Sequence, residues 1–198
     1  MTQLSAQAIH KLCQPTKWFG LRPQQPMIVP YLEEKVLIHG TSAGRSAATY
    51  DARAESEIVL GPNPGFLWAK VILEDGQYDE PWDVFDKYKE LIKSSPPSYA
   101  LINTIEDFYI PHNVCGRVLD KSTYARVFVS AFNTFFDPGF CGNATIELVN
   151  HSADYVTIKA GAPVIQMEFI YLDQKTNRPY KGKYQHQKKG PQPAIFEV

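Results

Sequence analysis

Several features that would assign a function directly are missing from this chain of 198 residues. Its 21 acidic and 20 basic residues leave a net charge of −1, so no global field favours nucleic acid or an anionic membrane as a partner. The three cysteines form no CxxC pair, which argues against a disulfide framework and a cysteine-rich zinc site. We therefore expect Cys13, Cys115 and Cys141 to be reduced core residues.

Membrane segments and common cofactor motifs are missing as well. No run approaches the roughly 18 apolar residues of a transmembrane helix, and the N-terminus lacks the apolar segment of a signal peptide. There is no GxxxxGK[ST], GxGxxG or HExxH motif, nor the HxE and PCxxC pair of zinc nucleobase deaminases. These absences predict a cytoplasmic protein whose chemistry does not depend on a metal-activated water.

The hydrophobic pattern predicts a mainly β fold. Ser5–Cys13 reads as a short helix, and HGTSAGR at 39–45 reads as a small-residue loop leading into a strand from Tyr50. From Tyr99 onward, turn residues recur at intervals of about ten residues, which is typical of a β-sandwich or barrel. We expect strands at 36–38, 98–111, 113–120, 125–133, 142–150, 155–161 and 164–172.

The length predicts a single domain over residues 1–198. Residues 61–97 fit an insertion that holds one strand and an amphipathic helix at 80–94. The basic, Gly- and Pro-rich tail at 177–198 is predicted to be a mobile arm.

Candidate chemistry gathers between Asp120 and Asn150. Ser122 and Arg126 are four residues apart beside Lys121, so one helical turn would present a hydroxyl and two cations to an anion. Glu147 interrupts an apolar strand, which suits either a desolvated general acid/base or a solubilising charge.

Three other groups have plainer explanations. DPGFCG, with Asp137 and Phe140, fits a hairpin facing a flat ligand, although a simple turn is commoner. Asp51 and Arg53 are two residues apart and share a strand face. We interpret them as an ordinary ion pair or a subunit contact and not as catalytic residues. The lysines of the tail suit a polyphosphate clamp or a disordered tail.

Taken in order, five segments resemble the dCTP deaminase branch of the dUTPase-like superfamily. They are TYDAR at 49–53, DKSTYAR at 120–126, FDPGFCGNATIELVN at 136–150, AGAPVIQMEF at 160–169 and KGKYQHQKKGP at 181–191. The resemblance implies a distorted jelly-roll-like β-barrel or sandwich, assembled as a homotrimer with active sites between subunits. It also implies hydrolytic deamination of dCTP to dUTP and ammonia, with Mg²⁺ on the triphosphate and no zinc.

The resemblance also implies roles for individual residues. Glu147 would be the general acid/base, and Ser122 and Arg126 would position the water and the glutamate. Lys121 and Ser122 would also face phosphates, while Asp137 and Phe140 would hold the deoxyribose and base. The arm would close over the triphosphate through Lys183, Tyr184 and Gln187, and Gln166 would serve packing or subunit contacts.

Two departures from the family pattern stand out. Val127 and Phe128 follow Arg126, so Phe128 stands where the ARxG pattern of the family has glycine. The loss of this glycine would change the shape of the base pocket. His186 and an extra lysine alter the KYxGQxG pattern of the tail, which bears on the phosphate chain accepted.

Other functions stay open. Asp137 would allow a bifunctional enzyme that also hydrolyses dUTP to dUMP and pyrophosphate. Deamination of dCMP or of a modified deoxycytidine nucleotide is a further alternative. A noncatalytic trimer that binds nucleotide is disfavoured, because a scaffold needs none of Ser122, Arg126 and Glu147.

Overall fold

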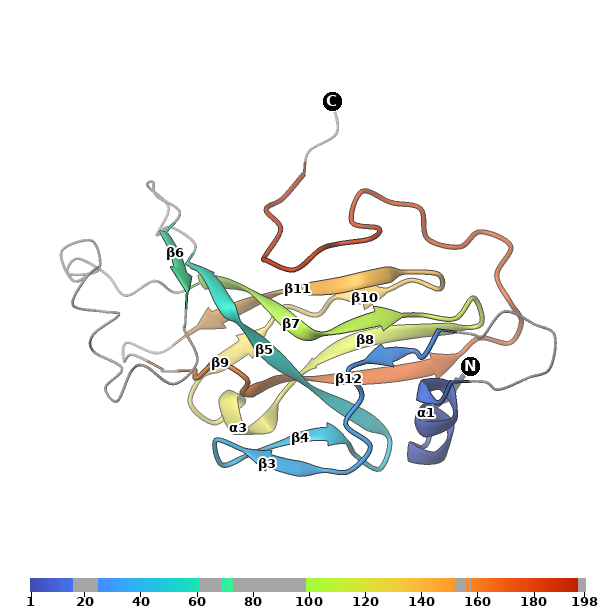
Figure 1. Ribbon diagram of the computed structural model, residues 1–198, viewed down its shortest axis with the longest axis horizontal. Helices are drawn as coiled ribbons and strands as arrows, with labels where there is room; N and C mark the ends of the chain where they lie inside the picture. The colour runs from blue at the N-terminus through green and yellow to red at the C-terminus, as the bar shows by residue number, and fades with distance from the viewer. Residues whose placement is uncertain (16–24, 61–68, 73–98, 152–155, 157, 196–198) are drawn as a thin grey trace.

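The computed structural model describes residues 1–15, 25–60, 69–72, 99–151, 156 and 158–195. Within these residues the chain is mainly β, as predicted (Figure 1). Its elements are β1 (Thr2–Gln3), α1 (Ala6–Cys13), β2 (Ile28–Val29), β3 (Val36–Ile38), β4 (Thr41–Arg45), β5 (Thr49–Leu60), β6 (Ala69–Ile72), β7 (Tyr99–Tyr109), β8 (Val114–Asp120), α3 (Ser122–Ala125), β9 (Val129–Ala131), β10 (Phe135–Phe136), β11 (Cys141–Asn150) and β12 (Pro163–Tyr171).

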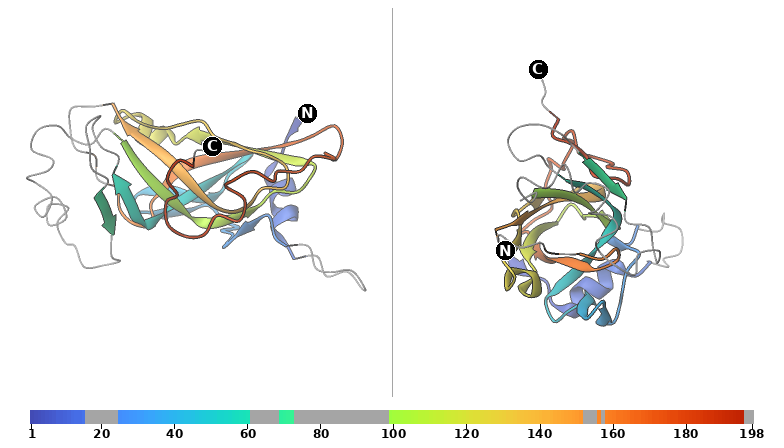
Figure 2. Two further views of the ribbon diagram at one scale, coloured as in Figure 1. Left: turned by 90° about the horizontal axis from the view of Figure 1, so that it is seen from above. Right: turned by 90° about the vertical axis from the view of Figure 1, so that its left-hand side faces the viewer.

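The strands form one antiparallel sheet that curls on itself. Its main path runs β10-β8-β12-β5-β7-β11-β9, and β5 belongs to both halves because it pairs with β12 and, past a register shift, with β7. The two ends of the path, β9 and β10, follow each other in the chain. Between them Phe132 N donates to Glu147 O of β11 at 2.9 Å, and Thr134 O accepts from Val118 N of β8 at 2.9 Å. The connection between β9 and β10 thus bridges the two edges of the curled sheet and closes the barrel, which is seen end-on in the right-hand view of Figure 2.

The barrel interior holds the hydrophobic core. Phe108, Ile146 and Phe169 are fully buried there, and each such side chain stabilises the fold by about 1.5–3 kcal/mol. Helix α1 covers one end, with Ile9 buried (Figure 1). The Ser5 hydroxyl caps it by accepting from Ala8 N at 3.3 Å, so the predicted helix and its cap are confirmed.

Most predicted strands are confirmed, but three predictions are wrong. The predicted strand at 125–133 shrinks to the three residues of β9, because the chain first makes the turn α3. No strand occurs at the described positions of 155–161, namely Val156 and 158–161. The loop expected before Tyr50 is strand β4, whose Gly44 packs so closely that a Cβ atom would lie 2.6 Å from Glu34 O.

The region predicted as an insertion is described only in part. Strand β6 pairs with β5, while the predicted helix at 80–94 lies outside the described residues. Among the described residues no helix is long and apolar enough to cross a membrane. All three cysteines carry free thiols; Cys13 and Cys115 are buried, whereas Cys141 is only partly buried.

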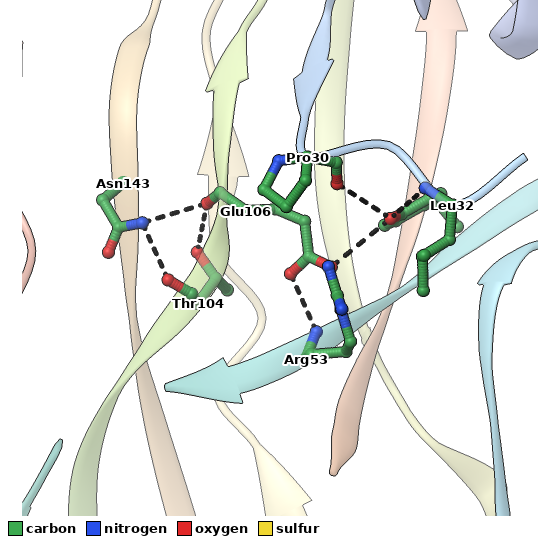
Figure 3. A network of polar contacts seen from close by, with 7 residues as sticks. Pro30, Leu32, Arg53, Thr104, Glu106 and Asn143 are labelled. Atoms are coloured by element: carbon green, nitrogen blue, oxygen red, sulfur yellow. Dashed lines mark hydrogen bonds and ion pairs between the residues drawn. The ribbon is translucent and has the colours of Figure 1, made fainter. Parts of the chain in front are cut away.

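A polar network crosses the core between β5, β7 and β11 (Figure 3). Glu106 is 0% exposed and accepts from Arg53 Nε at 2.7 Å and from Arg53 N at 2.9 Å. Tyr50 OH donates to the same carboxylate at 3.3 Å. Arg53 thus pairs with Glu106 rather than with Asp51, so the ion pair suggested by their shared strand face is not formed.

Candidate active site

Glu147 lies on the outer face of β11. Strand alternation turns Ile146 and Leu148 into the core, while Glu147 is partly buried at the seam where the barrel closes. Burial raises the pKa of the Glu147 carboxyl, and a hydrogen bond from Thr134 opposes that rise. A carboxyl with a raised pKa in a partly desolvated position suits proton transfer near neutral pH.

The turn α3 carries Ser122 and Arg126. Arg126 N donates to Ser122 O at 3.3 Å, so the expected helical turn forms and brings positions 122 and 126 to one face. Both side chains are exposed. The Ser122 hydroxyl and the Arg126 guanidinium are therefore accessible to an anion or a water molecule.

Three contacts fasten this turn beside the half of β11 that carries Glu147. Ser130 and Ala131 of β9 pair with Val149 and Leu148. Asp120 Oδ1 accepts from Ala131 N at 2.8 Å. At the far side of the turn, His151 N donates to the carbonyl oxygen of residue 128 at 2.8 Å. The turn and Glu147 thus share one part of the sheet.

Phe128 closes the turn in an unusual conformation. Its φ of 60° lies in the left-handed region that favours glycine, and its side chain is 67% exposed. This is the position where the resembling family has a glycine. The backbone thus keeps the conformation that glycine suits, while a bulky side chain occupies the position.

Phe128→Gly is expected to raise the free energy of unfolding by about 1 kcal/mol, because glycine removes the left-handed strain of a side chain that buries little area. Chemical denaturation of both proteins measures the difference. Val127→Gly is the matched control, since Val127 lies outside the left-handed region, and it should lower stability by about 0.5–1 kcal/mol. A Phe128→Gly variant that is less stable than wild type would show that the left-handed conformation of Phe128 does not destabilise the protein.

Lys121 lies directly before the turn but is buried. Its Nζ atom is 2.9 Å from Asp51 Oδ2 and donates to Ser42 Oγ at 3.1 Å. The contact between Lys121 and a phosphate therefore stays a prediction, while the ion pair with Asp51 is an additional finding.

The Asp137 hairpin lies at the other end of β11. Phe140 N donates to Asp137 O at 3.0 Å, which confirms the turn, and the Asp137 side chain is exposed. Phe140 is buried, with its ring 4.9 Å from that of Phe136 in an edge-to-face contact and 5.9 Å from that of Tyr180. Contact of Asp137 and Phe140 with a nucleotide stays a prediction.

The C-terminal arm runs along this same end of β11 (Figure 1). Gln187 forms a bridge with Gly142, and Asn143 N donates to Gln187 O at 3.0 Å. A Cβ atom at Gly142 would lie 2.6 Å from Gln187 N, so glycine is what admits the arm. Further on, Gln192 N donates to Thr145 Oγ1 at 3.0 Å, which brings the arm to within two residues of Glu147.

Lys183 and Tyr184 are held within the arm. Tyr184 OH accepts from Ile195 N at 3.1 Å, and Lys183 Nζ donates to Ile195 O. Lys183 Nζ also lies 5.4 Å from the centre of the Tyr184 ring, within the range of a cation–π contact. Both residues are therefore arranged by the end of the arm itself.

The predicted site residues fall into two groups within one chain. Lys121, Ser122, Arg126 and Glu147 lie near the C-terminal half of β11, whereas the Asp137 hairpin and Gln187 lie at its start. Cys141 and Glu147 are six residues apart on one strand, a separation of about 20 Å. The predicted residues are thus separated along β11, and the arm contacts this strand from Gly142 to Thr145.

Sequence reasoning did not single out Thr134 or Ser42. Thr134 lies in the segment that links β9 to β10, where its hydroxyl lowers the pKa of Glu147. Ser42 meets Lys121 from a strand that had been read as a loop. Among the described residues, no group of three or more His, Cys, Asp and Glu side chains is arranged to hold a metal ion.

Comparison with known proteins completes this description. A family model described as dCTP deaminase-like matches residues 31–172. The dCTP deaminase of Campylobacter curvus (strain 525.92) is 36% identical over 177 residues, covering 88% of this chain and 92% of that protein. The dCTP deaminase of Campylobacter hominis is 34% identical over 174 residues, covering 86% and 89%.

One solved structure shares the fold. It is 2'-deoxycytidine 5'-triphosphate deaminase from Agrobacterium tumefaciens, with a TM-score of 0.54 and 15% identity, covering 85% of this chain and 47% of that one. The chain thus spans about half of that structure's length, and the likeness concerns the fold alone.

Proposed function

Because this chain belongs to the dCTP deaminase-like family, we propose that it catalyses the hydrolytic deamination of dCTP to dUTP and ammonia. The observation that carries the proposal is Glu147, a partly buried carboxyl whose pKa is raised by burial. Its strand pairs with β9, which directly follows the turn with the exposed Ser122 and Arg126. General acid/base catalysis needs such a group close to the operating pH.

In the proposed mechanism the Glu147 carboxylate takes a proton from a water molecule while the oxygen of that water bonds to C4 of the cytosine. The same carboxyl then delivers this proton to N3 of the base, takes the proton of the new C4 hydroxyl and passes it to N4. The C4–N4 bond then breaks, which releases ammonia and leaves the uracil ring with its C4 carbonyl. Ser122 and Arg126 orient the water and the carboxylate through hydrogen bonds that their exposed positions permit. No covalent intermediate with the protein is needed.

The hairpin and the arm would bind the remaining parts of the substrate. We assign Asp137 and Phe140 to the deoxyribose and base, and Lys183, Tyr184 and Gln187 to the closing arm. Support comes from the arm's path along β11, from Gly142 to Thr145. Mg²⁺ would bind through the phosphate oxygens, and we assign no protein ligand to it.

We further propose that the enzyme is a homotrimer with shared active sites. The two groups of site residues lie about 20 Å apart along β11, so a site that combines them draws on neighbouring copies. Four large apolar side chains are exposed between residues 127 and 135, and such clusters commonly mark association surfaces: Val127, Phe128, Phe132 and Phe135. Light scattering of the purified protein tests this assembly, and a monomer at assay concentration would contradict it.

One assay separates the candidate functions. The purified protein is incubated with dCTP, dCMP or dUTP and Mg²⁺, and ammonia and pyrophosphate are measured. Ammonia from dCTP without pyrophosphate supports the proposal, and both products indicate a bifunctional enzyme that uses Asp137, which is exposed on its turn. No ammonia from any substrate, with a folded protein, would refute deamination of these nucleotides.

The pH dependence of the reaction should reflect the raised pKa of Glu147. The carboxylate is the active form, so activity should fall as pH drops through a pKa above the usual 4.5. Thr134→Val removes the hydrogen bond that favours the charged form, so the acid limb of kcat/KM should move toward neutral pH. Thr176→Val, which removes a loop hydroxyl bonded to Arg178 N, is the control. An unmoved acid limb in Thr134→Val would assign that limb to another group.

A further inference from the structure

A buried ion pair stands directly in front of the turn α3. The side chains of Lys121 and Asp51 are only 5% and 1% exposed, and Lys121 Nζ lies 2.9 Å from Asp51 Oδ2. Ser42 Oγ accepts from Lys121 Nζ and donates to Asp51 Oδ2, both at 3.1 Å. Gln166 Nε2 donates to Asp51 Oδ1 at 3.3 Å, so both carboxylate oxygens are occupied.

The pair joins the sheet to the turn. Asp51 lies on β5 and pairs in register with Gln166 of β12, so its position is fixed by the barrel wall. On the other side, the main chain of Lys121 begins α3, because Lys121 O accepts from Tyr124 N at 2.9 Å and from Ala125 N at 3.0 Å. The residue whose side chain is fixed in the sheet is thus covalently joined to Ser122.

The turn itself has little intrinsic stability. It is four residues long, and its first residue is preceded by Lys121, which provides no side-chain cap. A helix of this length does not persist without tertiary contacts. Its geometry therefore depends on its tertiary contacts: the ion pair with Asp51, the packing of Tyr124 against the core, and the backbone contacts of Asp120 and His151.

Stability alone is a poor reason for this ion pair. Burying two charges costs about as much as their attraction returns, and apolar residues of similar volume often serve as well. What a buried charged pair provides is a fixed distance and direction. Here the residue held at a fixed position is Lys121, which directly precedes Ser122 and lies about one helical turn before Arg126.

We propose that Asp51 is a positioning residue for the deamination reaction: by holding Lys121, it fixes Ser122 and Arg126 relative to Glu147. The inference depends on the proposed function. In this arrangement Lys121 acts as the anchored partner of Asp51.

A double-mutant cycle tests the inference. Asp51→Asn keeps the shape of the side chain and removes its charge, Lys121→Met removes the cation, and the double variant is again neutral. For each variant, kcat and KM for dCTP are measured by ammonia release, with the folded fraction determined by circular dichroism. Each single change should lower kcat on the order of 100-fold with little change in KM. The kcat of the double variant should be no lower than that of the less active single variant, because the two substitutions remove the same interaction.

Asp173→Asn is the matched control, since Asp173 is exposed and accepts only a local bond from Gln174 N at 3.0 Å, and it should keep wild-type kcat. If Asp51→Asn fails to fold, the neutral double variant carries the test, and a wild-type kcat in it would overturn the inference. Additive losses, with a raised KM in Lys121→Met alone, would instead make Lys121 a phosphate ligand and overturn it too. Asp51 and Lys121 variants that are less stable but keep the wild-type kcat per folded molecule would also overturn the inference.

The two proposals fail in different ways. An active wild type with fully active Asp51 and Lys121 variants would refute the positioning role and leave deamination standing. A folded wild type that releases no ammonia from dCTP would refute both.

Discussion

Replacing Glu147 by glutamine is expected to lower kcat for dCTP by roughly 10²- to 10⁴-fold while dCTP still binds. Glutamine has the shape of glutamate and fits the same partly buried position opposite β9, so the pocket is preserved. It cannot take the proton of the attacking water or pass one to the base. Ammonia release gives kcat, and calorimetric titration with dCTP gives the affinity.

Glu33→Gln is the control for this variant. It makes the same chemical change on a glutamate whose side chain is 53% exposed, and it should leave kcat unchanged. Wild-type turnover in Glu147→Gln would remove Glu147 from its role as general acid/base. Loss of both turnover and binding would show instead that the carboxylate shapes the pocket.

The largest expected effect on stability is that of Glu106→Ala. The change leaves the guanidinium of Arg53, whose side chain is 14% exposed, without its carboxylate (Figure 3). It also removes one of the two acceptors of Tyr50 OH, the other being Pro30 O. Breaking a buried ion pair by removing one partner costs about 3–5 kcal/mol. Chemical denaturation should show a decrease of this size in the free energy of unfolding.

Two further variants define this effect. Glu33→Ala removes a glutamate that faces His10 at the surface, and it should cost less than about 1 kcal/mol. In the double variant Arg53→Met with Glu106→Ala, neither charge of this pair is left, so part of the stability should return. A Glu106→Ala variant as stable as Glu33→Ala would show that the pair contributes little to folding.

Local patterns in the sequence predicted the elements that depend on near neighbours. The alternation of apolar residues located β7, β8, β11 and β12, and the spacing behind Ser5 located α1. Motif order also identified the family, because the segments that resemble it recur in the same sequence order. Short elements escaped the pattern: β10 has two residues, and β4 consists of small residues that read as a loop.

Charge pairing followed the fold instead of the sequence. Asp51 and Arg53 are two residues apart on one strand, yet each pairs with a residue more than fifty positions away, Lys121 and Glu106. Strand pairing chooses these partners, since it determines which side chains meet across the core. Local spacing carries no information about that choice.

The stretch from Asp120 to Asn150 shows the same division. Its residue types alone predicted a helical turn, a hairpin and an acidic residue in an apolar strand, because each depends on neighbours within a few positions. The environment of each residue depended on barrel closure, which places Thr134 against Glu147, buries Lys121 on Asp51 and turns Phe140 into the core. Burial and partners come from contacts between segments far apart in the chain, and these contacts exist only after the sheet has curled.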